Sequence, residues 1–145
     1  MYCSLSLGPI AAACLGLMPI AAAASDMVVA VSGITSDAGE IGCALFGTPC
    51  GFPLDTSTAV TQWRHADRGG VTCRFERLHP GSYAVAVGHD LNGNHRTDTN
   101  WLGIPTEPWG VSNNVRPRLR APRFEEAAVQ LAAGAAVTIN VRVAP

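Results

Sequence analysis

Most of the chain after residue 26 consists of short segments in which apolar and polar side chains alternate. Successive side chains of a β-strand point to opposite sides, so this period of two predicts strands with one buried face. In the segment 71–78, Val71, Cys73 and Phe75 would share one face, and the polar residues between them would share the other. Similar segments occur at 27–33, 40–46, 59–65, 82–90, 127–131 and 136–143.

Turn-forming residues separate these segments, for example at 36–39, 68–70, 79–81 and 133–134. About seven strands in roughly 120 residues, without a long helical period, predict an all-β fold, a single antiparallel β-sandwich of immunoglobulin-like type. The segment FEEAAVQL, where Glu125 and Glu126 would suit a helix start, is interpreted as a strand with an irregular beginning. Tyr83 follows a Pro-Gly turn, and its ring would be either a tyrosine corner or a simple core residue.

The first 24 residues have a different character, because an apolar run is followed by a series of alanines. Ala22 and Ala24 fit the small-x-small pattern of a signal peptidase site, so we expect a signal peptide at 1–24 and a mature domain at 25–145. The protein would then be periplasmic or secreted, with no stable membrane span after cleavage. No Lys or Arg precedes the apolar run, and a retained anchor is the alternative, although the segment is short for a span.

The charge pattern argues against nucleic acid as a partner. The formal net charge is -1, and all ten basic residues are arginines. Such a balance creates no strong field over the surface. The one basic run, Arg116–Arg123, is interrupted by prolines, which predicts an extended and solvated loop.

Three cysteines remain in the expected mature domain, so two of them can pair in an oxidising compartment. Cys43 lies in an alternating segment, whereas Cys50 lies in the turn-like sequence GTPCGFP. We expect a Cys50–Cys73 disulfide, because a bridge from loop to strand would hold the Thr- and Ser-rich connection between them. Cys43 would then be reduced and buried.

The segment 88–110 concentrates side chains with oxygen ligands. Calcium prefers six to eight oxygens, and in calcium loops they alternate along the chain. Two residues depart from the loop pattern: His95 stands where glycine eases the turn, and Trp101 stands where a closing glutamate is expected. The predicted weak calcium ligands are Asp90, Asn92, Asn94, the Arg96 carbonyl and Asp98, with Glu107 as the closing carboxylate. The alternative is a hydrogen-bonded loop, rich in Asp and Asn, that needs no ion.

The segments LHPGSYAVAV, HDLNGNHRTDTNWLGIPTEPWGVSNN and APRFEEAAVQL together resemble the DUF2141 family of exported bacterial proteins of unknown function. The resemblance covers essentially the whole expected mature domain. It implies export and a transthyretin-like or carboxypeptidase-regulatory-like sandwich, and it implies no reaction. The chain departs from the family pattern at His95, where a glycine is usual, and at Trp109, where Tyr or Phe is common.

Two classes of function follow. The first is a non-enzymatic binding protein, in which Trp101 and Trp109 flank a surface for carbohydrate or peptide beside the loop; both rings would otherwise only cover it as a small core. The second is a metal-dependent hydrolase. Its site would consist of His89, His95, Asp98 and Glu107, but neither an HxH nor an HxxxH spacing supports it. Ser112 lacks the G-x-S-x-G surroundings of a nucleophile.

Overall fold

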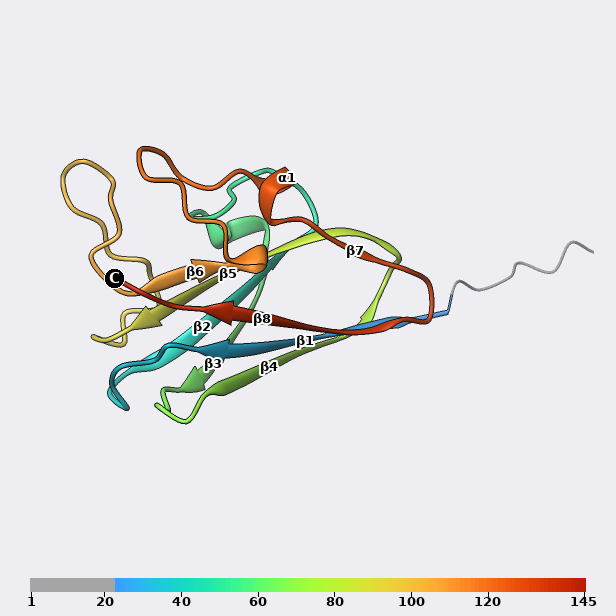
Figure 1. The fold of residues 1–145 in the computed structure, drawn as a ribbon, viewed down its shortest axis with the longest axis horizontal. Helices are drawn as coiled ribbons and strands as arrows, with labels where there is room; N and C mark the ends of the chain where they lie inside the picture. Colours follow the sequence, from blue (N-terminus) through green and yellow to red (C-terminus); the bar gives the residue numbers. More distant parts are fainter. Residues whose placement is uncertain (1–22) are drawn as a thin grey trace, which may run out of the picture.

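The computed structural model describes residues 23–145 and confirms that the chain is mostly β-structure (Figure 1). The expected signal peptide therefore falls, except for its last two residues, outside the described residues. Within residues 23–145, no helix is long and apolar enough to cross a bilayer. The elements are β1 (Ser25–Ser32), β2 (Glu40–Phe46), η1 (Thr56–Thr58), β3 (Val60–His65), β4 (Val71–Leu78), β5 (Gly81–Asp90), β6 (Trp109–Val111), η2 (Ser112–Asn114), α1 (Phe124–Ala127), β7 (Val129–Leu131) and β8 (Ala136–Arg142).

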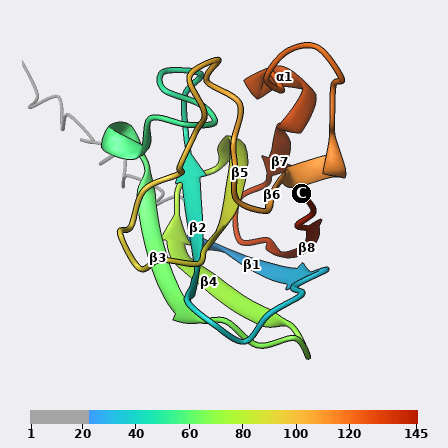
Figure 2. The same cartoon turned by 90° about the vertical axis from the view of Figure 1, so that its left-hand side faces the viewer.

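The strands form two sheets (Figure 2). One has three strands in the order β4-β1-β8, and the other has the order β3-β2-β5-β6, with β7 paired to the beginning of β5. β1 and β8 run parallel, so the expectation of a purely antiparallel fold is wrong for this pair. Parallel neighbours require a long connection, and here β2 to β7 supply it. Side-chain alternation carries no information about strand direction.

The inner faces of the two sheets share one hydrophobic core. On every contributing strand, the residues that belong to this core occupy alternate positions, in agreement with the expected period of two. β2 is buried on its other face as well. The core includes Met27, Val29 and Val31 of β1, Ile41, Cys43 and Leu45 of β2, Val71, Cys73 and Phe75 of β4, Val85 and Val87 of β5, and Val141 of β8.

A disulfide joins the two sheets through this core, and it links Cys43 to Cys73. The predicted Cys50–Cys73 pairing is therefore wrong, and Cys50 is exposed and free. The reason is geometric: Cys43 and Cys73 both point inward, from β2 and β4, and their Cα atoms lie 6.5 Å apart, which is within the range for a disulfide. The side-chain alternation that predicted burial of Cys43 also directs its side chain into the core, where Cys73 lies.

Side-chain carboxamides cover both free edges of the three-stranded sheet. On the β4 edge, Gln62 of β3 donates to the carbonyl of Arg74 at 2.5 Å and accepts from its N–H at 3.2 Å. On the β8 edge, Asn114 donates to the Asn140 carbonyl at 3.1 Å and accepts from the Arg142 N–H at 2.8 Å. Each carboxamide takes the place of a neighbouring strand, and so satisfies backbone groups that would otherwise be open to another chain.

A second, smaller cluster covers one end of the outer face of the five-stranded sheet. Phe52 contacts both Phe46 and Phe124 edge to face, at 5.3 and 6.0 Å between ring centroids. Phe124 belongs to α1, so the segment interpreted as an irregular strand begins as a helical turn before β7. The Tyr83 hydroxyl donates to the His79 carbonyl at 2.9 Å, which confirms the bond expected of a tyrosine corner.

Substitution of either bridged cysteine tests the inter-sheet disulfide. The two positions are 30 residues apart, so the chain-entropy relation predicts a loss of about 3–4 kcal/mol in unfolding free energy for Cys43→Ala or Cys73→Ala. The matched control, Cys50→Ser, should change it by less than about 0.5 kcal/mol. Denaturant unfolding gives the energies, and non-reducing peptide mapping that found Cys50 in a bridge would refute the assignment.

Candidate functional site

The carboxylate of Asp90, the last residue of β5, organises the loop that follows. Asp90 is only 2% exposed. Its Oδ1 accepts the N–H groups of Gly93 and Asn94 at 2.8 and 3.2 Å, and its Oδ2 accepts that of His95 at 2.7 Å. Hydrogen bonds to an ionised acceptor are about twice as strong as neutral ones, so this side chain ends the strand and sets the path of the chain.

The two asparagines of the loop repeat this arrangement and converge on Asp98. The Oδ1 of Asn92 accepts the Asn94 N–H at 3.0 Å, and the Oδ1 of Asn94 accepts the Arg96 N–H at 2.9 Å. Their Nδ2 groups donate to the two carboxylate oxygens of Asp98, at 2.6 and 2.9 Å. Three of the predicted ligand side chains therefore meet at one point.

Glu107 also lies at this loop, although it is far along the sequence. Its carboxylate accepts the Leu91 N–H at 2.9 Å and the Asp98 N–H at 3.4 Å. The chain returns because Thr106 N–H donates to the Asp98 carbonyl at 2.8 Å. Glu107 thus holds the backbone of the loop at two points, Leu91 and Asp98.

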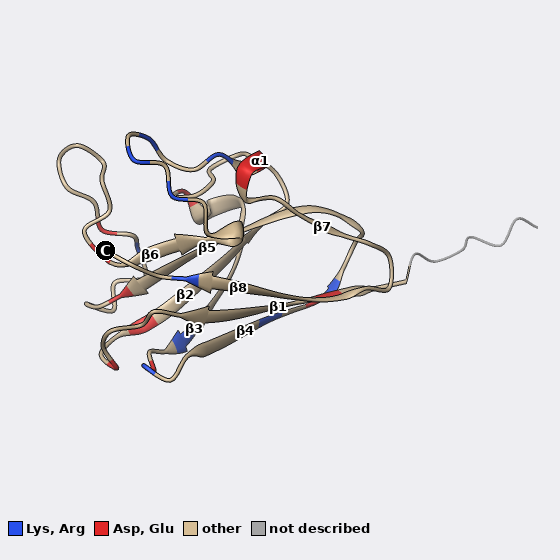
Figure 3. Cartoon of the chain, in the orientation of Figure 1, with Lys and Arg blue, Asp and Glu red and all other residues tan. Residues whose placement is uncertain are grey.

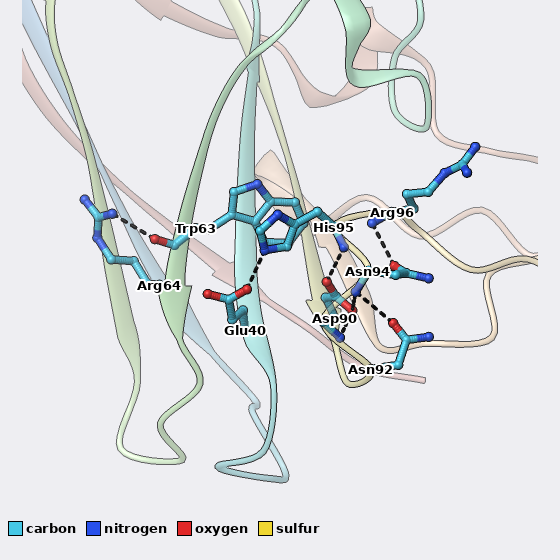
Figure 4. A network of polar contacts seen from close by, with 9 residues as sticks. Glu40, Trp63, Arg64, Asp90, Asn92, Asn94, His95 and Arg96 are labelled. Atoms are coloured by element: carbon cyan, nitrogen blue, oxygen red, sulfur yellow. Dashed lines mark hydrogen bonds and ion pairs between the residues drawn. The ribbon is translucent and has the colours of Figure 1, made fainter.

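His95 adopts the left-handed conformation, with φ of 57°, at the position where the family pattern has glycine. This conformation costs a residue with a side chain roughly 1 kcal/mol. Contacts of the ring offset that cost: it stacks on Trp63 of β3 at 4.2 Å between centroids, and Nε2 lies 2.5 Å from a carboxylate oxygen of Glu40 (Figure 4). The local sequence around the loop gives no sign of Glu40 and Trp63, because β2 and β3 come next to the loop only in the folded sheet.

The ligand atoms of the four predicted hydrolase residues do not form one metal-binding group in the described chain. Among residues 23–145, one group of three His, Cys, Asp or Glu side chains places its ligand atoms within 4.8 Å of one another, and it consists of Glu40, Asp90 and His95. His89 does not join it. This ring is fully buried, with Nε2 at 2.8 Å from the Ala38 carbonyl, and it alternates along β5 with Asp90.

A cleft of about 1070 Å³ opens beside the loop, over the outer face of the five-stranded sheet. Trp109 lines it, and the Arg116 guanidinium lies 4.4 Å above the Trp109 ring. Trp101 is 90% exposed and does not line the cleft. Of the two tryptophans expected to flank one surface, only Trp109 lines the cleft, and Trp63 is the second tryptophan there.

The basic run forms another wall of this cleft and is anchored at both ends. Its arginines lie on the loop that precedes α1 (Figure 3). Arg116 donates to the carbonyls of Ala144 and Pro145, both at 2.7 Å. Arg120 pairs with Glu126 of α1 at 2.6 Å. The hydrogen bond from Arg120, followed by that from the Arg123 N–H, lowers the pKa of Glu126 to about 2. The carboxylate therefore stays ionised, and keeps this contact, well below neutral pH.

The Ser-Asn-Asn sequence at 112–114 has a structural role in the fold. Ser112 is fully buried, and its hydroxyl accepts the Val85 N–H at 2.9 Å and donates to the Ala127 carbonyl at 2.6 Å. Asn113 donates to the carbonyls of Glu126 and Ala128, each at 3.1 Å. These side chains join η2 to β5 and α1, so the Ser112 hydroxyl is already occupied by backbone groups.

Replacement of Asp90 tests its control of the loop. Asp90→Ala removes the acceptor of three N–H groups and should lower the unfolding free energy by about 2–4 kcal/mol. Asp67, whose exposed carboxylate accepts only the Gly69 N–H, is the control, and Asp67→Ala should cost less than about 1 kcal/mol. Equal losses in denaturant unfolding would show that Asp90 has no special part in the loop.

The similarity of this chain to known proteins is at the level of one family. The sequence model of one family, described as "Uncharacterized protein conserved in bacteria (DUF2141)", matches residues 29–140. No curated protein and no solved structure shows a significant match to the chain. The matched region contains the loop, the cleft floor and the Ser-Asn-Asn sequence, and the chain belongs to the DUF2141 family of bacterial proteins.

Proposed function

We propose that the protein is an exported, non-enzymatic β-sandwich of the transthyretin-like or immunoglobulin-like type, which binds a ligand beside a calcium-ordered loop. The observation that carries the proposal is the convergence of Asn92, Asn94 and Asp98 side chains next to the buried carboxylate of Asp90. Two sheets around one core support the sandwich, and the disulfide between them suits an oxidising compartment.

A calcium ion fits the chemistry of this convergence. The two oxygens of Asp98 face the amide groups of Asn92 and Asn94. To bind the ion, the Asn92 and Asn94 oxygens would have to leave the N–H groups of Asn94 and Arg96 that they now accept. Turned toward Asp98, they would direct two neutral oxygens and one carboxylate at a shared point. Glu107 and the Arg96 carbonyl would complete the set. Few carboxylates in an exposed loop favour weak binding, nearer the millimolar range of extracellular modules.

A binding role is favoured over catalysis because the conspicuous reactive groups already serve the fold. The Ser112 hydroxyl holds backbone groups of β5 and α1, and His89 is buried on the side of β5 opposite Asp90. The cleft, by contrast, is open beside the loop and lined by Trp63, Trp109 and several arginines. Calcium would act by holding the loop that forms its wall.

Thermal unfolding in calcium and in chelator tests the ion site. With a dissociation constant of ~1 mM, ~10 mM calcium should stabilise the folded state by about 1.4 kcal/mol. For a domain of this size the melting midpoint then rises by a few degrees. Asp98→Asn should abolish the rise, since it removes charge at the point of convergence, whereas Asp67→Asn should preserve it. Absence of both a shift and a calorimetric binding signal in the parent protein would refute the ion.

Expression of the full chain in a bacterium with a periplasm tests export. We expect the protein in the periplasmic fraction or the medium, with Ser25 as its first residue by N-terminal sequencing. Ala24→Arg should block cleavage, because signal peptidase requires a small residue at that position. The proposal fails if the chain keeps residues 1–24 and remains in the cytoplasm or the membrane.

A further inference from the structure

The floor of the cleft is built from glycines and alanines on neighbouring strands. Gly42 lacks the Cβ that would collide with the Trp63 ring, which therefore lies over β2. At Gly88 an added Cβ would meet nothing closer than Thr97 Oγ1 at 3.9 Å, so its missing side chain is open space in the cleft. The other floor residues are Ala44, Ala86 and Gly110.

This floor has no free hydrogen-bonding groups to offer. The backbone of β2 is paired with β3 and β5, and the backbone of β5 is paired with β2 and β6. A peptide or a sugar on the floor would leave its own polar groups without partners, at a cost for each buried group of about 1–3 kcal/mol. A hydrocarbon chain has no such groups and gains from contact with the apolar surface.

The rim of the cleft carries several exposed apolar side chains among its polar residues. Four aliphatic residues that line it are exposed to solvent, and they come from three different loops. Exposed apolar patches of this kind mark binding surfaces in folded proteins. The four residues are Leu54, Leu102, Ile104 and Leu119.

The charges at the mouth favour an anion. The three acidic side chains that line the cleft, those of Asp55, Asp90 and Glu107, each accept backbone N–H groups. In the described part of the chain, the guanidinium groups of Arg96 and Arg118 have neither an ion pair nor a hydrogen bond, and both residues line the cleft. A carboxylate head group would complement them.

We propose that the cleft binds a free, single-chain fatty acid, with its acyl chain on the Gly42–Gly88 floor and its carboxylate at Arg96 and Arg118. A volume of about 1070 Å³ accommodates such a ligand, since pockets for small molecules usually measure about 300–1,000 Å³. The inference rests on the proposed binding role and names the ligand of that surface.

Titration of the purified protein with dodecanoate below its micellar concentration tests the inference, with tryptophan fluorescence and calorimetry as readouts. Dodecanoate should bind with one-to-one stoichiometry. Acetate, which lacks the chain, and dodecyltrimethylammonium, which reverses the charge, should bind at least about tenfold more weakly. Equal binding of the cationic amphiphile would overturn the assignment of the head group, and sedimentation with phosphatidylglycerol vesicles without binding of dodecanoate would replace the free fatty acid by a membrane surface.

Gly88→Leu fills the floor and should weaken dodecanoate binding by at least about tenfold, with little change in melting temperature because the space is open. Gly47→Leu, an identical substitution outside the cleft, should leave binding unchanged.

If Gly88→Leu impairs folding, the double variant Arg96→Gln/Arg118→Gln tests the inference instead. It should weaken binding roughly three- to tenfold, and Arg74→Gln on the other sheet should have no effect. Unchanged binding in the double variant and in folded Gly88→Leu would overturn the inference.

Each titration is repeated in calcium and in chelator, which separates this inference from the ion site. Binding of dodecanoate without any calcium-dependent melting shift would support the fatty-acid site and remove the ion from the proposed function. A calcium-dependent shift without binding of dodecanoate would overturn the fatty-acid site and leave the ion in place.

Discussion

The buried carboxylate of Asp90 is the interaction on which the candidate site depends. It accepts three backbone N–H groups in succession, from Gly93 to His95, at the point where β5 ends. Without that acceptor, the three N–H groups would lose the hydrogen bonds that stabilise the sharp turn. This turn places the His95 ring on Trp63 and beside Glu40, and these contacts connect the loop to β2 and β3. The Asp90 side chain thus positions the loop after β5 so that it forms a wall of the cleft.

The proposed calcium site and the proposed fatty-acid site are linked through this wall. The same loop carries the oxygens that converge on Asp98 and the Arg96 guanidinium that faces the cleft. An ion that orders the loop would restrict where Arg96 and Ile104 lie. Because rigid surroundings lower the entropy lost on binding, calcium would then favour ligand binding without touching the ligand.

Side-chain carboxamides hydrogen-bond to backbone groups that a neighbouring strand would bind in other sheets. Gln62 and Asn114 cover the two edges of the three-stranded sheet, and Asn113 holds the carbonyls at the end of α1. A carboxamide carries both a donor and an acceptor, as a peptide group does. The Ser-Asn-Asn sequence is explained by these structural bonds, which leaves the loop and the cleft as the regions of functional interest.

The sequence by itself determined most of the strands and the face of each that contributes to the main core, because these follow from a local period of two. It left the Tyr83 ring as either a tyrosine corner or a core residue, and it did not indicate β6. It also indicated that the side chains of Asp90, Asn92, Asn94 and Asp98 lie near one another, since residues at nearly alternate positions of one turn need no other part of the chain. Only the tertiary structure decided that Cys43 pairs with Cys73, that β8 runs parallel to β1, and that Trp63 rather than Trp101 lines the cleft. Those contacts join residues distant along the chain, and they depend on strand order and direction, which side-chain alternation leaves open.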